Sequence, residues 1–220
     1  MIRVGLNGFG RIGRALARIL STKRKYKLVL INEINNDIKN LAYLLKYDSI
    51  YGKFKKDVTT KGKNITVNKN EIKVFSKSKI QDVPWKSNKI DVVIDATGTN
   101  ANLKSAKKVL RSGVKKVIVT HSPKKHVDFT MILGVNEKKY NYDNHHIISS
   151  SICDASAVGP ILSQIEKKWS IESGFITTLH SGLSYQNLLD GPLQSVSSPG
   201  HQWKDYSLGR NSLASLIPKK

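Results

Sequence analysis

Three glycines near the N-terminus constrain the fold of this 220-residue chain more than any other feature. Gly8, Gly10 and Gly13 have the spacing G-x-G-x-x-G, and they follow a short apolar run that begins at Ile2. The order strand, glycine turn, helix is typical of dinucleotide-binding α/β folds. There the glycines allow a tight turn, close approach of the backbone to a pyrophosphate, and close packing of helix on strand.

The segment after the glycines has the period of an amphipathic helix. The residues that fall on one predicted face are Ile12, Ala15, Leu16, Ile19 and Leu20. A second apolar run ends at Asn32, so the first thirty-odd residues read as β-turn-α-β. This order predicts parallel strands joined by a right-handed crossover.

Glu33 ends the second predicted strand, 20 residues after Gly13. A carboxylate at this place accepts hydrogen bonds from the ribose hydroxyls of a dinucleotide and repels a 2′-phosphate. The sequence therefore predicts NAD, and not NADP, as the cofactor.

Further alternation extends the pattern. A helix is predicted over 38–45, a hairpin over 64–75, a strand from Ile90, a helix ending at Gly113, and another strand over 115–120. Such alternation favours a Rossmann-type, doubly wound parallel sheet over residues 1–150. Residues 151–220 offer one helix, a strand over 174–180 and a long loop, too little to close a core of their own.

The composition bounds the partners. Lys and Arg number 37 against 16 Asp and Glu, and the net charge is +21. The lysines are spread along the whole chain without interleaved aromatic residues, which favours a diffuse charged surface over a nucleic-acid site. The chain has one cysteine, no signal-peptide pattern and no apolar run of about 20 residues. A soluble cytoplasmic protein without a membrane contact or a metal site is expected.

Cys153 is the only cysteine. Val158, Ile161, Leu162, Ile165 and Trp169 keep a helical period after it, so Cys153 is predicted to lie at a helix N-terminus. On spacing alone, Cys153 is equally well explained as a small buried residue and as a nucleophile.

Several longer strings resemble the glyceraldehyde-3-phosphate dehydrogenase family and, in part, erythrose-4-phosphate dehydrogenase. They are VGLNGFGRIGR, LLKYDSIYGKF (44–54), IDATG, GVN (134–136), and Cys153 followed by His180. The resemblance implies an NAD-binding domain over 1–150, followed over 151–220 by the N-terminal, incomplete part of an α+β catalytic domain. It also implies a small aldehyde substrate and, where the full domain is present, a homo-oligomer of the family's tetrameric kind.

The resemblance further implies the roles of individual residues. The pyrophosphate loop would comprise Asn7, Gly8, Phe9, Gly10, Arg11, Ile12 and Gly13. The adenosine ribose would be bound by Glu33, and other parts of the cofactor by Thr97, Gly98 and Thr120. On the substrate side, Arg210 matches an arginine of the family, and Asp154 lies beside the cysteine.

In the family's chemistry, a cysteine thiolate adds to the aldehyde, and the hemithioacetal loses hydride to NAD and becomes a thioester. Cys153 would be the nucleophile and His180 the base. The flanking residues depart from the family pattern, because Ile152 offers no hydroxyl and Asp154 is an anion that repels phosphate. Two alternatives stay open: a catalytically inactive NAD-binding remnant, and a basic module that binds RNA or another polyanion.

Overall fold

The computed structural model describes residues 1–121, 123 and 126–179. Within these residues the strands form one mixed sheet in the order β3-β4-β5-β2-β1-β6-β7-β9-β8. The seven strands from β5 to β8 in this order run parallel to one another: β5 (Asn70–Phe75), β2 (Tyr26–Asn32), β1 (Ile2–Asn7), β6 (Val92–Asp95), β7 (Lys116–Val119), β9 (Ile147–Ser149) and β8 (Phe129–Thr130). The strands β3 (Val58–Lys61) and β4 (Asn64–Val67) extend the sheet in antiparallel fashion beyond β5.

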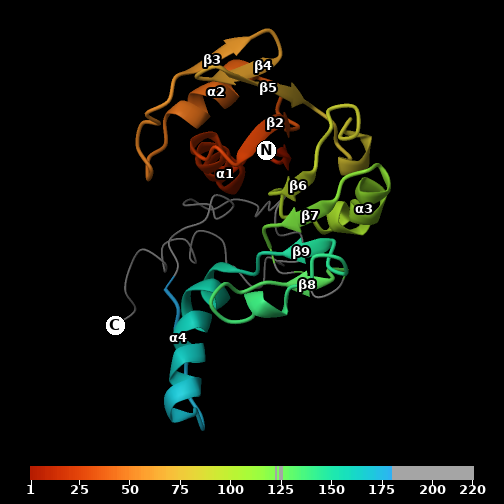
Figure 1. Ribbon diagram of the computed structural model, residues 1–220. Coiled ribbons are helices and arrows are strands. Elements are labelled where there is room, and N and C mark those ends of the chain that lie inside the picture. Colours follow the sequence, from red (N-terminus) through yellow and green to blue (C-terminus); the bar gives the residue numbers. More distant parts are fainter. Residues whose placement is uncertain (122, 124–125, 180–220) are drawn as a thin grey trace, which may run out of the picture.

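Helices cover both faces of the parallel part (Figure 1). The first face carries α1 (Arg11–Thr22) and α2 (Ile38–Lys46), and the other carries α3 (Asn100–Arg111) and the 3-10 turn η1 (Ile80–Asp82). A second 3-10 turn, η2 (Glu137–Lys139), lies between β8 and β9, and α4 (Cys153–Trp169) follows β9. The doubly wound, Rossmann-type sheet that the alternation predicted is confirmed.

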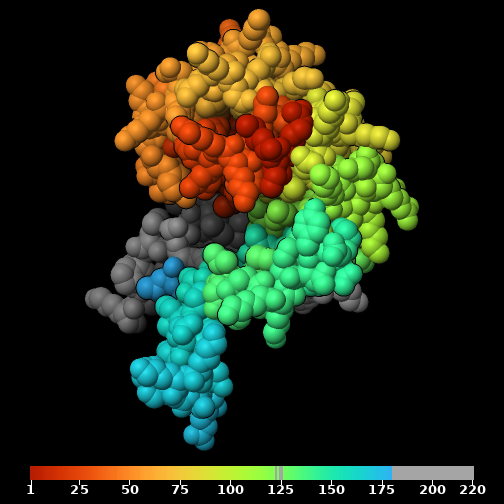
Figure 2. All heavy atoms as spheres, in the orientation of Figure 1, coloured from red at the N-terminus to blue at the C-terminus, as the bar shows by residue number. Residues whose placement is uncertain are grey.

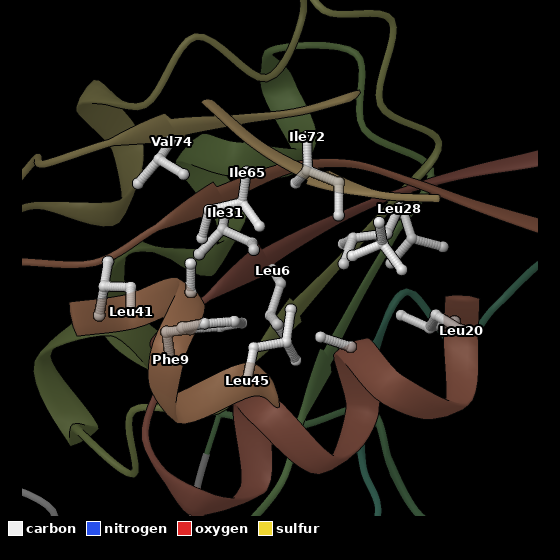
Figure 3. Close-up of a cluster of buried hydrophobic side chains, with 14 of the residues drawn as sticks. Leu6, Phe9, Leu20, Leu28, Ile31, Leu41, Leu45, Ile65, Ile72 and Val74 are labelled. Atoms are coloured by element: carbon white, nitrogen blue, oxygen red, sulfur yellow. The ribbon is translucent and has the colours of Figure 1, made fainter. Parts of the chain in front are cut away.

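The first face of the sheet packs on α1 and α2 through a continuous apolar core (Figure 3). Leu6, Leu28 and Ile31 from the central strands meet Leu41 and Leu45 of α2. The hairpin adds further apolar side chains, namely Ile65, Val67, Ile72 and Val74. This core explains why the predicted hairpin over 64–75 joins the sheet and does not stand apart.

The second face packs on α3 around the large, fully buried side chain of Trp85. Trp85 is 1% exposed, and its indole N–H donates to the carbonyl of Ile80 at 2.7 Å. A Cβ added to Gly5 of β1 would lie 2.5 Å from the Trp85 ring. A glycine at position 5 is therefore what allows the ring to pack directly against the strand.

The predicted buried face of α1 is partly wrong. Ile12 and Ile19 are 54% and 53% exposed, whereas Gly13, Ala17 and Arg18 are buried. Arg18 occupies a core position because its guanidinium satisfies two carbonyls, Leu45 at 2.9 Å and Gly52 at 3.0 Å. Its stem can then replace an apolar side chain, which a count of apolar residues does not anticipate.

The strand predicted over 174–180 is also not observed within the described residues. Residues 173–179 have no regular secondary structure, and Phe175 and Leu179 are exposed. The preceding helix α4 forms as predicted, but it extends away from the sheet and buries none of its residues (Figure 2). Without a neighbouring strand in the described part of the chain, this apolar run has nothing to pair with.

Candidate functional site

The predicted cofactor residues gather at the carboxyl ends of β1, β2, β6 and β7, where a buried polar network joins the strands. Asn32 donates from its side-chain amide to Oδ1 of Asn7 at 2.7 Å, and Asn7 donates in turn to Oδ1 of Asp95 at 3.0 Å. All three residues are at most 4% exposed. The network fixes the three strand ends relative to one another, which positions the loops that follow them.

The glycine loop between β1 and α1 combines two tight contacts with one open position. Gly8 has φ +89°, and a Cβ added to Gly13 would lie 2.1 Å from the carbonyl oxygen of Gly8. At Gly10, by contrast, an added Cβ would meet nothing within 4 Å. The backbone at Gly10 is therefore open to an approaching ligand.

The first turn of α1 has the features of an anion site. Gly10 is the N-cap residue and provides no side-chain hydrogen bond, and the first turn contains no acidic residue. Its N–H groups and the partial positive charge of the helix N-terminus are thus available to a pyrophosphate. Arg11 adds a positive charge at this end of the helix. Its side chain is 45% exposed, and its Nη2 lies 4.0 Å from Asp48 Oδ1.

Glu33 lies directly after β2 and faces the glycine loop. Its Oε2 accepts a hydrogen bond from the Phe9 N–H at 2.6 Å, and its Oε1 accepts one from the Asn35 N–H at 3.1 Å. A carboxylate has about four acceptor positions, so lone pairs remain for ribose hydroxyls. Phe9 itself is 1% exposed and directs its ring into the core (Figure 3), so only its backbone belongs to the loop.

The turn after β6 is held by the same network. Asp95 Oδ1 accepts from the Thr97 N–H and hydroxyl at 3.2 and 2.7 Å, and Asn102 donates to the Thr97 hydroxyl at 2.8 Å. Gly98 follows with φ +70°. Thr120, directly after β7, donates its N–H to the Asp95 carbonyl at 3.1 Å. The predicted residues Thr97, Gly98 and Thr120 thus lie around Asp95.

Two buried groups beside this turn lack a hydrogen bond to any described residue. They are Asp95 Oδ2 and both ring nitrogens of His121. Burial raises the pKa of Asp95, and burial lowers the pKa of His121, an effect that the negative charge of Asp95 partly offsets. An acid, Asp95, and a base, His121, therefore interact with little access to solvent at the carboxyl-terminal edge of the sheet, which we call the cofactor edge.

Cys153 is the first residue of α4, as predicted, and its thiol is exposed. Hydrogen bonds of Ser149 hold the segment that leads to Cys153. Its Oγ donates to the His121 carbonyl at 2.5 Å and accepts from the Ser151 N–H at 3.0 Å. Ile152 is the N-cap residue and gives no side-chain cap, and Asp154 lies in the first turn. Cys153 and Asp154 thus follow the carboxyl end of β9, on the same edge of the sheet as the glycine loop.

Two predicted site residues, His180 and Arg210, lie outside the described residues. No site role was predicted for Asn32 or His121, and Asp95 was expected near the cofactor only as part of the turn after its strand, although the structure places all three at the carboxyl-terminal edge of the sheet. Their places in the sequence could have indicated a role, because Asp95 ends a strand two residues before Thr97 and His121 follows Thr120 directly.

The described part of the chain contains no group of three or more His, Cys, Asp or Glu side chains that could hold a metal ion. None of the helices in the described ranges is both long enough and apolar enough to cross a membrane.

Comparison with known proteins supports the cofactor assignment. Residues 2–103 match the family described as "Glyceraldehyde 3-phosphate dehydrogenase, NAD binding domain". The open Gly10, the uncapped α1 and the carboxylate of Glu33 all fit this dinucleotide, so the first part of the chain is an NAD-binding domain with NAD as its cofactor.

Whole-chain similarity extends further. The chain is 39% identical to glyceraldehyde-3-phosphate dehydrogenase 2 of Streptomyces avermitilis and 35% identical to glyceraldehyde-3-phosphate dehydrogenase 1 of Kluyveromyces lactis. Each match covers 99% of this chain and 62% of the relative. The enzyme of Geobacillus stearothermophilus is 35% identical, with 61% of its length covered. The chain thus spans about three fifths of the length of these curated relatives.

Proposed function

Because the chain belongs to the glyceraldehyde-3-phosphate dehydrogenase family, we propose that it takes part in the NAD-dependent oxidation of a small aldehyde through Cys153. The observation that carries the proposal is the placement of Cys153. The only thiol of the chain is exposed at the first position of a helix, on the sheet edge that also carries the cofactor loop.

The chain's own residues would act as follows. The glycine loop, α1 and Glu33 bind and orient the dinucleotide, and the loop from Ser149 to Ser151 positions the thiol. The sulfur of Cys153, at the first position of α4, adds to the carbonyl carbon of the aldehyde. NAD, when bound, supplies the hydride acceptor.

His180 is proposed as the base that takes the hydroxyl proton of the hemithioacetal as it becomes a thioester on Cys153. Water or phosphate would then take the acyl group and free the thiol. Arg210 and Asp154 are proposed to contact the substrate. In this proposal, residues 1–150 bind the cofactor, and residues 151–220 form the first part of the catalytic domain.

A second candidate function, NAD binding without catalysis, is favoured by the surroundings of the thiol. Ile152 is 46% exposed and its side chain provides no hydrogen-bond donor, and Asp154 introduces a negative charge in the first turn of α4.

For the enzymatic function, the same two features oppose a phosphate group beside Cys153, so an unphosphorylated aldehyde is the favoured substrate.

The test compares the 220-residue chain with its Cys153→Ser variant. NADH formation is followed with glyceraldehyde and with glyceraldehyde 3-phosphate, and NAD binding is measured in parallel. We expect the variant to lose NADH formation at least about a thousandfold, as is usual for loss of a covalent nucleophile, and to keep its NAD affinity because Cys153 is exposed.

Mass spectrometry of Cys153 during turnover should detect the acyl adduct. Equal NADH formation by the variant would exclude Cys153 as the nucleophile. Normal NAD binding without NADH formation from either aldehyde, together with ordinary alkylation rates of Cys153, would favour the non-catalytic function.

A further inference from the structure

A hollow lies at the amino-terminal edge of the parallel sheet, opposite the edge that carries the glycine loop. Its volume is about 560 Å³, within the range of small-molecule sites. Residues at or near the starts of β1, β2 and β5, together with the turn over 87–89, line it. The hollow is thus separated from the cofactor loop by the length of the strands.

Cations dominate this hollow. Five basic side chains line it, with one carboxylate, Glu71, among them; the five are Arg3, Lys27, Lys69, Lys73 and Lys89. Glu71 accepts a hydrogen bond from the Asn64 side chain at 2.7 Å. Asp91, which accepts from the Arg3 backbone N–H at 2.9 Å, does not line the hollow and is already paired with Lys115 at 2.8 Å. Five neighbouring cations with one acid repel one another, and an anion bound between them would relieve that repulsion.

Two of the cations are held in place by a buried amide residue. Arg3 donates from Nε to the Lys89 carbonyl and from Nη2 to the Asn88 carbonyl, both at 2.9 Å. Lys73 donates from Nζ to Asn88 Oδ1 at 3.0 Å. Asn88 is 8% exposed, and its Nδ2 donates to the Pro84 carbonyl at 2.8 Å. The guanidinium and the ammonium are thereby pre-organised, which lowers the entropy lost when a ligand binds.

From this arrangement we propose that the hollow is a binding site for a small anion that carries two or more phosphate groups. Arg3 and Lys73 form its fixed part, and the exposed Lys27, Lys69 and Lys89 close around the ligand. Arginine and lysine are the usual ligands of phosphate oxygens. A single phosphate would leave most of the five cations unpaired, whereas a polyphosphate reaches several of them.

The shape argues for a small molecule and against a nucleic acid. The cations converge on one hollow and do not form a stripe, and none of the residues that line it is aromatic. Proteins that bind single-stranded nucleic acid combine a basic groove with aromatic rings on which bases stack. The hollow offers phosphate contacts without such rings.

The experiment titrates the full chain with inorganic tripolyphosphate in an isothermal calorimeter, in the presence of saturating NAD so that the cofactor edge is occupied. The test variant is Lys27→Gln/Lys73→Gln, and the matched control is Lys104→Gln/Lys107→Gln, which removes two exposed charges from α3. All four lysines are exposed, so both variants should fold. Inorganic phosphate and a single-stranded RNA are titrated in parallel.

We expect one tripolyphosphate per chain, with affinity at least about tenfold lower in the test variant and unchanged in the control. Inorganic phosphate should bind more weakly than tripolyphosphate. Equal losses in the two variants would show that only the overall charge matters and would overturn the proposal. Absence of tripolyphosphate binding, or RNA binding that alone responds to Lys27→Gln/Lys73→Gln, would overturn it as well.

Discussion

The side-chain amide of Asn7 donates a hydrogen bond to the carboxylate of Asp95 at 3.0 Å, so two buried residues 88 positions apart join the ends of β1 and β6. Asp95 Oδ1 also accepts from the Thr97 N–H and hydroxyl. One carboxylate oxygen therefore fixes both the end of the first strand and the turn that carries Thr97 and Gly98. The cofactor edge depends on this oxygen.

Asp95→Ala should therefore destabilise the fold and weaken NAD binding together. The Asn7 amide and the Thr97 donors lose their acceptor, and each buried unsatisfied group costs about 1–3 kcal/mol. Urea unfolding, followed by the fluorescence of buried Trp85, measures the first effect, and NAD titration measures the second. The exposed Asp57→Ala is the control and should change neither quantity. Unchanged NAD affinity in a folded Asp95→Ala protein would contradict this role.

Two glycine substitutions should separate folding from cofactor binding. In Gly13→Ala the new Cβ would lie 2.1 Å from the Gly8 carbonyl oxygen, so we expect a loss of at least about 2 kcal/mol of stability and loss of NAD binding. Gly10→Ala meets no atom within 4 Å and should change stability by less than about 1 kcal/mol. Its methyl group nevertheless occupies space at the α1 N-terminus and should weaken NAD binding about tenfold or more.

Thermal unfolding and NAD titration of the two variants check this contrast. The interpretation of the loop would be wrong if Gly10→Ala bound NAD as tightly as the parent chain. It would also be wrong if the two variants lost stability equally.

Glu33→Gln should reduce the preference for NAD over NADP. The variant keeps an oxygen that can accept from the Phe9 N–H, but it loses the charge that repels a 2′-phosphate. We expect the ratio of the two dissociation constants to fall about tenfold, as measured by titration with each dinucleotide. Glu137→Gln is the control, because that carboxylate too accepts from the backbone, namely from the Gly134 N–H at 2.8 Å. If the ratio of the NAD and NADP dissociation constants were unchanged in Glu33→Gln, Glu33 would not contact the ribose.

Arg18 is a core residue that hydrophobic periodicity could not identify. Its guanidinium bonds the carbonyls of Leu45 and Gly52 and lies 5.3 Å from the centre of the Phe54 ring. Arg18→Met fills much of the volume but leaves both carbonyls without this donor, so we expect a loss of about 2–4 kcal/mol in urea unfolding. The exposed Arg24→Met should stay within about 0.5 kcal/mol. Equal stability of the two variants would show that the Arg18 hydrogen bonds contribute little.

The parts of the fold that could be predicted from the sequence are those with a local signal. The glycine spacing, the change of period after it, and the apolar runs of β1, β2 and β6 identify the Rossmann-type sheet because each depends on neighbouring residues. Gly113 was recognised as a helix end, and it has φ +100° two residues after α3.

The remaining features depend on contacts between distant segments. Asp95 and His121 come together because β6 and β7 pair with Asp95 beside Val119, a register that no local pattern specifies. The apolar run over 174–179 has the composition of a strand, yet a strand needs a partner, and the described residues give it none. Cys153 could be placed at a helix start from local period alone, whereas its relation to His180 is a prediction.

The buried Asp95 and His121 should give the stability of the fold an unusual pH dependence. Burial lowers the pKa of His121 in the folded chain below its ordinary value of 6.5, so between the two values the unfolded chain binds more protons. The stability that neutral His121 contributes is therefore present above about pH 6.5 and is lost as the pH falls through the folded pKa. Burial raises the pKa of Asp95, so acidification makes the folded chain bind more protons, and the sign of this contribution is opposite.

Single variants separate the two contributions. Between about pH 7.5 and about pH 5.5, the free energy of unfolding should fall less steeply in His121→Gln than in the parent chain. As the pH falls further toward 3.8, the ordinary pKa of Asp95, the parent chain should gain a stabilising contribution that Asp95→Asn lacks. One proton accounts for at most about 1.4 kcal/mol per pH unit, which sets the largest difference in slope. If His121→Gln showed the parent slope, His121 would have to be equally solvated in the folded and unfolded chain, contrary to its buried ring nitrogens.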